Sequence, residues 1–144
     1  MSAACAADDP IDLGLLPRTA RVDDGRLTVG GGMSDNPRPA TYGARYEAFV
    51  PARVHARRPF VASVAGKHCE QGDVLVRDAR LPADVAVGDV VATPVTGAYG
   101  HSMASNYNLV PRPAVVFLRD CRARVVVRRE TLDDLIARDE DDQS

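Results

Sequence analysis

The chain contains a succession of short apolar segments, rich in valine, that are separated by glycine, proline and aspartate. Such segments are typical of β-strands, and the residues between them are typical of turns. In the segment that begins at Val74, alternation places Val74 and Val76 on one face and Leu75 on the other. A weaker candidate for a strand is 45–54. We expect strands in the segments 26–29, 59–66, 73–82, 89–95, 114–119 and 124–129.

One clear helical pattern follows the last of these segments. Thr131 is a candidate N-cap, and Asp134 stands at the spacing of a capping box. The sequence predicts a weakly ordered segment at 1–24, with a helical turn at 9–16, then one β-domain at 25–139 and an acidic tail at 140–144. The expected fold is mainly β: a small antiparallel barrel or sandwich with a short C-terminal helix.

Composition excludes several classes of function. A chain of 144 residues fits one domain, and its net charge of -2 gives no reason to expect a nucleic-acid partner. No apolar run approaches the length of a membrane span. The first residues lack the basic start and apolar stretch of a secretory signal, so we expect a cytoplasmic protein with no membrane partner.

The stretch GKHCEQGD, residues 66–73, concentrates reactive side chains between two predicted strands. Consecutive residues cannot all face one point on a strand, but they can do so on a loop. Lys67 and His68 would favour the thiolate of Cys69 if they lie close to it, which makes a reactive thiol one interpretation. The alternative is an inert, half-buried cysteine beside solvated charges. The spacing matches no zinc site, so we expect no metal.

Two further stretches carry candidate binding groups. VGGGMSDNPRP places a glycine run after a strand, which suits either phosphate binding by backbone N–H groups or a simple strand-to-loop junction. TGAYGHSMASNYN crowds polar and aromatic side chains into a short segment. That segment is either a binding loop or an ordinary polar connection with a helical turn.

Taken in order, four stretches resemble the C-terminal part of the bacterial diaminopimelate decarboxylase family. The resemblance covers about residues 29–139, and its motifs agree in order and spacing. It rests on GGMSDNPRPATYGARYEAF, GKHCEQGDVLVRDARLP, VGDVVATPVTGAYGHSMASNYNLVPRPAVVFLRD and RVVVRRETLDDLIARD.

The resemblance implies a fold, a reaction and a set of site residues. The family joins a (β/α)8 barrel to a β-domain like that of alanine racemase, and it converts meso-diaminopimelate to L-lysine and CO2 with pyridoxal 5'-phosphate. By this resemblance Cys69 is the proton donor and Glu70 contacts the distal end of the substrate. Arg38 and Tyr42 hold the substrate carboxylate and nearby polar groups, and Tyr99 contacts cofactor and substrate. The cysteine and glutamate enter the active site of the partner subunit in a dimer.

The chain departs from the family in ways that bear on activity. It lacks the (β/α)8 barrel, and Lys67, its only lysine, does not occupy the position that binds the cofactor covalently. Gly30 replaces an aspartate usual in the family, and Gln71 replaces a serine. We therefore expect a decarboxylase portion that needs a barrel-bearing subunit or homodimer partner. The alternatives are a non-catalytic module that regulates a full-length decarboxylase, or the remnant of a truncated gene.

Overall fold

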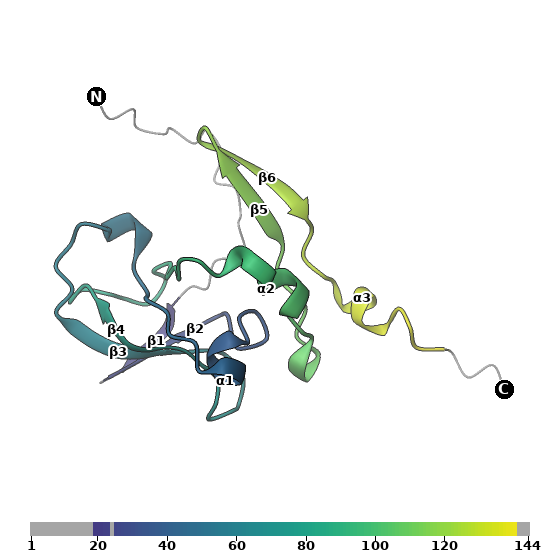
Figure 1. Ribbon diagram of the computed structural model, residues 1–144, viewed down its shortest axis with the longest axis horizontal. Helices are drawn as coiled ribbons and strands as arrows, with labels where there is room; N and C mark the ends of the chain where they lie inside the picture. The colour runs from purple at the N-terminus through teal and green to yellow at the C-terminus, as the bar shows by residue number, and fades with distance from the viewer. Residues whose placement is uncertain (1–18, 24, 141–144) are drawn as a thin grey trace. The chain divides into compact units, whose positions relative to one another are not determined.

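The computed structural model describes residues 19–23 and 25–140, and its chain divides into two compact units. Of the described residues, those from 19 to 110 belong to one unit and those from 111 to 140 to the other. In the described part of the chain, the first unit carries a four-stranded sheet and the second a two-stranded hairpin followed by a short helix (Figure 1).

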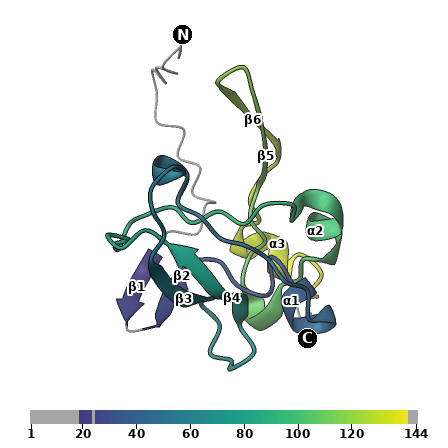
Figure 2. The same cartoon turned by 60° about the vertical axis from the view of Figure 1, so that its left-hand side comes forward.

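The larger sheet has its four strands in sequence order. It contains β1 (Thr19–Asp23), β2 (Arg26–Val29), β3 (Phe60–Ala65) and β4 (Val74–Leu81). The pairs β1–β2 and β3–β4 are antiparallel, whereas β2 and β3 are parallel (Figure 2). A parallel pair needs a long crossover connection, and residues 30–59 supply it. That crossover contains α1 (Arg38–Tyr42) and the 3-10 turn η1 (Pro51–Arg53).

The core of this unit is aliphatic and lies mainly on one face of the sheet. Leu27 and Leu81 are fully buried, and the crossover contributes Ala48 and Val50. The chain has few aromatic residues, so branched and small side chains fill the interior. The core consists of Leu27, Val29, Ala48, Val50, Ala62, Val64, Leu75, Val76, Ala79, Leu81, Val85 and Val91.

An irregularity in β4 changes which side chains face the core. Val76 pairs with Val64 and Ala79 pairs with Ala62, so β4 carries one residue more than β3 over this interval. Asp78 adopts a positive φ of 53° within the bulge. A second register shift lies between the pairs Val64–Val76 and Ala65–Val74, where β4 again carries one residue more than β3. Strict alternation therefore fails: Leu75 and Val76 are both buried, and burial resumes at Ala79.

The predicted strand at 89–95 is not a strand in the structure. Ala92 forms an isolated bridge with Phe49, and Val91 is buried, but the segment then turns away. Val95 has a φ of +60° directly after Pro94, and a proline cannot donate to a sheet ladder. The segment 45–54 likewise forms only this bridge and the turn η1.

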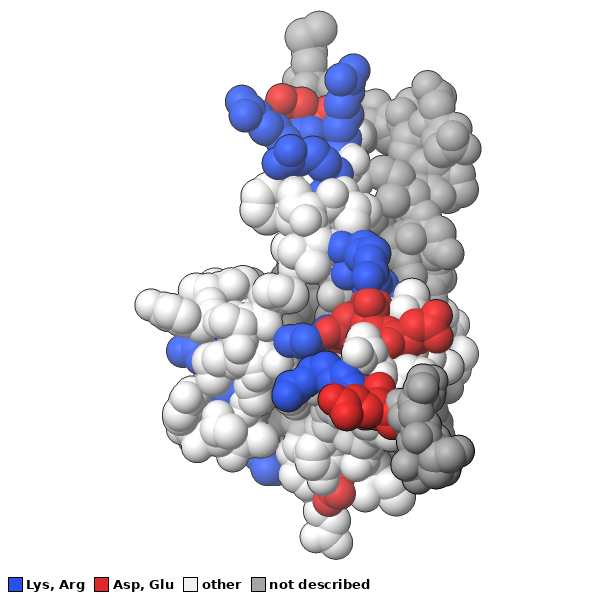
Figure 3. All heavy atoms as spheres, turned by 90° about the vertical axis from the view of Figure 1, so that its right-hand side faces the viewer, with Lys and Arg blue, Asp and Glu red and all other residues white. Residues whose placement is uncertain are grey.

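The second unit is regular but thinly packed. Strands β5 (Val115–Arg119) and β6 (Arg122–Val127) form a hairpin whose two turn residues, Asp120 and Cys121, both have positive φ. That conformation matches the twist of the flanking strands. Arginine side chains gather at the hairpin tip (Figure 3), where Arg119 lies 3.4 Å from Asp120.

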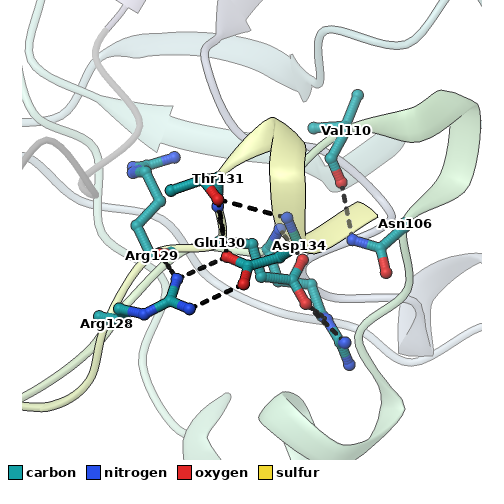
Figure 4. Close-up of polar contacts among 8 residues, drawn as sticks. Asn106, Val110, Arg128, Arg129, Glu130, Thr131 and Asp134 are labelled. Atoms are coloured by element: carbon teal, nitrogen blue, oxygen red, sulfur yellow. Dashed lines mark hydrogen bonds and ion pairs between the residues drawn. The ribbon is translucent and has the colours of Figure 1, made fainter. Parts of the chain in front are cut away.

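Helix α3 (Leu132–Ile136) begins as the sequence predicts. Thr131 is the N-cap, and its side chain and that of Asp134 form a reciprocal capping box (Figure 4). Arg128 donates to the Asp134 carboxylate, with one contact of 2.7 Å. Arg112 donates through Nε to Glu130 at 2.7 Å, which joins the two ends of the hairpin.

The prediction of a mainly β fold is confirmed, with two differences. The strand β1 falls in a segment for which no strand was predicted, and the parallel β2–β3 pair departs from the antiparallel expectation. The described residues form two open sheets and no closed barrel. The helical turn predicted at 9–16 lies outside the described residues. Among the described helices, none has the length and apolarity that crossing a membrane requires.

Candidate functional site

The loop between β3 and β4 presents Cys69 and Glu70 to solvent. Gly66 N–H donates to Asp73 O at 2.9 Å, which closes the base of the loop. Asp73 N–H in turn donates to Glu70 O at 3.2 Å. Cys69 is a free thiol and is exposed, as is Glu70. The stretch identified from its chemistry is therefore a loop, as predicted, and not the continuation of a strand.

A buried carboxylate holds this loop in place. Asp73 is only 2% exposed, and its two oxygens accept the backbone N–H groups of Met33 and His68, each at 2.7 Å. Charge-assisted bonds of this kind are short and strong, and both donors would otherwise be buried without partners. Asp73 thus ties the cysteine loop to the glycine-rich stretch after β2.

Two glycines make room for that carboxylate and for the neighbouring imidazole. A Cβ on Gly66 would lie 2.2 Å from Asp73 Oδ2, and a Cβ on Gly32 would lie 2.6 Å from His68 Cδ2. Neither space accommodates a methyl group without movement of the buried side chain. These glycines are needed for close approach, which is one of the physical roles of glycine.

The polar loops are also joined to each other by hydrogen bonds. Lys67 N–H donates to Gly31 O at 2.9 Å, and His68 Nε2 lies 2.9 Å from Ser34 Oγ. Ser105 N–H donates to Ser34 O at 3.0 Å. All three polar stretches noted in the sequence therefore meet at one place. His68 is buried there, beneath the exposed cysteine.

A tyrosine from the third stretch reaches Glu70. Tyr107 belongs to the 3-10 turn η2 (Tyr107–Leu109), and its hydroxyl donates to Glu70 Oε1 at 2.7 Å. The rings of His68 and Tyr107 meet edge to face, with centroids 5.3 Å apart. The hydrogen bond to Glu70 raises the pKa of the Tyr107 phenol, so the hydroxyl stays protonated and continues to donate.

A groove of about 660 Å³ runs beside this loop. Its walls come from the ends of β2, β3 and β4 and from the loop itself, so a thiol and a carboxylate border the same space. No group of three metal-ligating side chains occurs among the residues that the structure describes. The groove is lined by Arg26, Thr28, Ala65, Gly66, His68, Cys69, Glu70, Gln71, Asp73 and Val74.

The remaining predicted site residues lie on two short helices of the same unit. Arg38 and Tyr42 stand at the ends of α1, and Tyr99 lies in α2 (Gly97–Met103). Tyr42 is 69% exposed and Tyr99 is 76% exposed. In the described part of the chain, no hydrogen bond or ring contact joins these three residues to Cys69 or Glu70.

Tyr99 has an unusual backbone. Its φ of +62° and ψ of -9° interrupt α2, and bulky side chains rarely adopt this conformation. The same connection contains positive φ at Val95, Asn108 and Leu109. Residues held in such conformations are concentrated at functional sites, so the geometry favours a binding loop over an ordinary connection.

Sequence reasoning missed the buried support of the site. From the sequence, Asp73 was given no role of its own and His68 was treated only as a neighbour of the thiol, whereas both fix the loop. The sequence feature that could have indicated a structural role for Asp73 is its position directly after Gly72, at the start of a strand. The hydrogen bond from Tyr107 to Glu70 joins residues that are 37 positions apart in the sequence, so no local pattern predicts it.

Comparison with known proteins places this geometry in a family. A family model described as the C-terminal sheet domain of pyridoxal-dependent decarboxylase matches residues 19–97. The chain belongs to the pyridoxal-dependent decarboxylase family. It is 58% identical over 113 residues to diaminopimelate decarboxylase of Actinosynnema pretiosum subsp. auranticum, covering 78% of this chain and 25% of that protein. The diaminopimelate decarboxylase of Bacillus subtilis is 50% identical over 113 residues, which cover 78% of this chain and 26% of that protein.

Solved decarboxylase structures share the fold. Diaminopimelate decarboxylase from M. jannaschii in complex with L-lysine superposes with a TM-score of 0.77 and 36% sequence identity. That match covers 87% of this chain and 29% of the other. The resemblance inferred from the motifs is therefore confirmed. The chain spans about a quarter of the length of the curated relatives that it matches.

Proposed function

We propose that this chain supplies the cysteine and glutamate of a diaminopimelate decarboxylase active site that a barrel-bearing polypeptide completes. The observation that carries the proposal is the loop 66–73. It exposes Cys69 and Glu70 at the edge of one groove while a buried carboxylate anchors the loop from below. A rigid, solvent-facing presentation of a thiol and a carboxylate suits a site whose other half lies on another surface.

Each side chain has a role that its chemistry supports. The Cys69 thiol delivers a proton to the substrate carbon from which the carboxylate has left, and the sulfur becomes a thiolate. Glu70 accepts hydrogen bonds from the ammonium group at the far end of diaminopimelate. Arg38 offers the planar fork that binds both oxygens of a carboxylate. Tyr42 and Tyr99 add hydroxyl donors from exposed positions.

The residues of this chain do not fit a complete pyridoxal phosphate site. The family cofactor requires a lysine and a phosphate cradle, and the single lysine, Lys67, is exposed beside Cys69 on the loop. We assign the cofactor to the other polypeptide, with Tyr99 as this chain's contact to it. The chain mixed with an equimolar amount of pyridoxal phosphate should leave the absorbance of the cofactor unchanged. A stable new absorbance band that is lost in Lys67→Ala would contradict this assignment.

A rescue experiment tests the proposal. Full-length Bacillus subtilis diaminopimelate decarboxylase is prepared with alanine at the cysteine that matches Cys69. The inactive enzyme is then mixed with this chain after dissociation of its subunits, and CO2 release is measured. We expect the wild-type chain to restore turnover and Cys69→Ala to fail, because only the wild type brings a thiol.

The matched control changes the neighbouring exposed residue. Lys67→Ala removes a charged side chain from the same loop and should restore turnover as well as the wild type does. Co-sedimentation shows in parallel whether the chain and the enzyme form a complex. A stable complex without turnover would refute the catalytic role of Cys69.

One observation favours a second candidate, an interaction module that modulates a full-length decarboxylase. Phe117 and Leu118 on the β5–β6 hairpin are 58% and 72% exposed, and exposed apolar surface of this kind is typical of binding faces. This function predicts that adding the chain to wild-type enzyme alters its rate. Binding that leaves the rate unchanged would exclude regulation.

A further inference from the structure

Glu70 is held in one orientation by a residue outside its own loop. An exposed glutamate ordinarily samples several rotamers, and a ligand that binds it must restrict that freedom. Here Tyr107 donates its hydroxyl hydrogen to Oε1 at 2.7 Å. Oε2 is left to accept hydrogen bonds from a bound group, because one phenol hydrogen satisfies one carboxylate oxygen.

Tyr107 is itself fixed from two directions. Its ring meets the ring of buried His68 at an interplanar angle of 90°, a favourable arrangement for aromatic rings. His68 Nε2 lies 2.9 Å from Ser34 Oγ, so the imidazole cannot turn freely. Asn106 Nδ2 donates to Val110 O at 3.2 Å (Figure 4), which closes the turn that carries Tyr107.

We propose that Tyr107, supported by His68, is a positioning residue that presents the free oxygen of Glu70 to an ammonium group of the ligand. This inference rests on the proposed function, in which Glu70 contacts diaminopimelate. The hydroxyl keeps the carboxylate at the edge of the groove. Tyr107 contributes to recognition of the distal ammonium and takes no part in proton delivery by Cys69.

The kinetic test uses the rescue assay with Tyr107→Phe. Phenylalanine retains the ring that packs on His68, so the fold is preserved while the hydroxyl is lost. We expect KM for diaminopimelate to rise about tenfold, as the loss of one charge-assisted hydrogen bond allows, and kcat to stay within about twofold. Tyr46→Phe, which removes the hydroxyl of a tyrosine packed against the core, is the control. An unchanged KM for Tyr107→Phe would overturn the proposal.

A second measurement is independent of turnover. The chain is labelled with 13C at the tyrosine Cζ, and the Tyr107 resonance, assigned by its absence in Tyr107→Phe, is followed against pH. Glu70→Gln should move its titration to lower pH, because the phenol then loses its anionic acceptor. An unchanged Tyr107 titration would overturn the contact. Absence of rescue by the wild-type chain would instead refute the proposed function, so the two failures are distinguishable.

Discussion

The two units obtain their order in different ways. In the sheet unit, the strands, their crossover and the segment after β4 together bury twelve apolar side chains. In the hairpin unit, no side chain described between 111 and 140 is buried, and Phe117, Leu118, Leu132 and Ile136 are all exposed. A two-stranded hairpin alone is marginal in water. The candidate site therefore stands on the unit that has its own core.

Truncation of a leucine in each unit should give the largest difference in the free energy of unfolding. Leu27 is fully buried, and Leu27→Ala should lower the free energy of unfolding by about 4 kcal/mol through lost burial and the cavity left behind. Leu118 is 72% exposed, and Leu118→Ala should cost no more than about 0.5 kcal/mol. Urea denaturation followed by circular dichroism measures both.

Equal losses of unfolding free energy in Leu27→Ala and Leu118→Ala would contradict the difference in packing between the two units. The same titration bears on the remnant hypothesis. A remnant without a complete fold should unfold gradually, whereas a packed core should give one cooperative transition.

Loss of the buried carboxylate should have the next largest effect. Asp73→Ala leaves the N–H groups of Met33 and His68 without their acceptor, and we expect a loss of about 3 kcal/mol. Asp84→Ala is the matched control, because that carboxylate is exposed and its contact with Arg53 is long, at 3.7 Å. If both substitutions cost the same, Asp73 does not anchor the loop.

The fold could be predicted from the sequence only where local signals agree with tertiary contacts. The segments at β2, β3, β5 and β6 were predicted because valine content and turn residues coincide there. The face assignment in β4 was wrong because β4 carries an extra residue between Val74 and Val76, where β3 advances by only one residue, and period-two reasoning cannot detect such a bulge. The segment 89–95 is as apolar as a strand, yet Pro94 and the turn at Val95 end its pairing at Ala92.

The loop position of Cys69 and Glu70 could be predicted from the sequence, whereas the residues that support the loop could not. Cys69 and Glu70 stood out because they combine unusual chemistry with a loop position. Met33 and Asp73 are 40 residues apart, and their contact exists only after the crossover has brought β2 beside β3. Residue type and spacing report what a loop presents to solvent. They do not report which distant backbone groups a buried acid will satisfy.

A methyl group at the base of the loop should have a smaller effect. In Gly66→Ala the new Cβ would lie 2.2 Å from Asp73 Oδ2, so the carboxylate must move, and we expect a loss of about 2 kcal/mol. Gly72→Ala is a control in the same loop, since a Cβ there meets nothing within 4 Å. Nearly equal stabilities of the two variants would show that the loop adapts to the added group. They would also contradict its role as a rigid support.

Acidification should have the smallest effect and should act on the hairpin unit alone. The side-chain bond from Arg128, and then the backbone N–H of Thr131, hold the pKa of Asp134 far below its ordinary value of about 3.9. The folded chain binds this proton less readily than the unfolded chain does. The stabilisation is therefore present above the ordinary pKa and is lost as the pH falls through that value toward the folded one.

We expect the helical NMR shifts of α3 to weaken between about pH 5 and about pH 2, while those of β3 persist. Asp134→Asn should show the weakened α3 at every pH. Asp133→Asn, on the same exposed turn, should retain the pH dependence of the wild type. If α3 and β3 lose their shifts together, the two units unfold as one, and the contrast in their packing does not translate into separate stabilities.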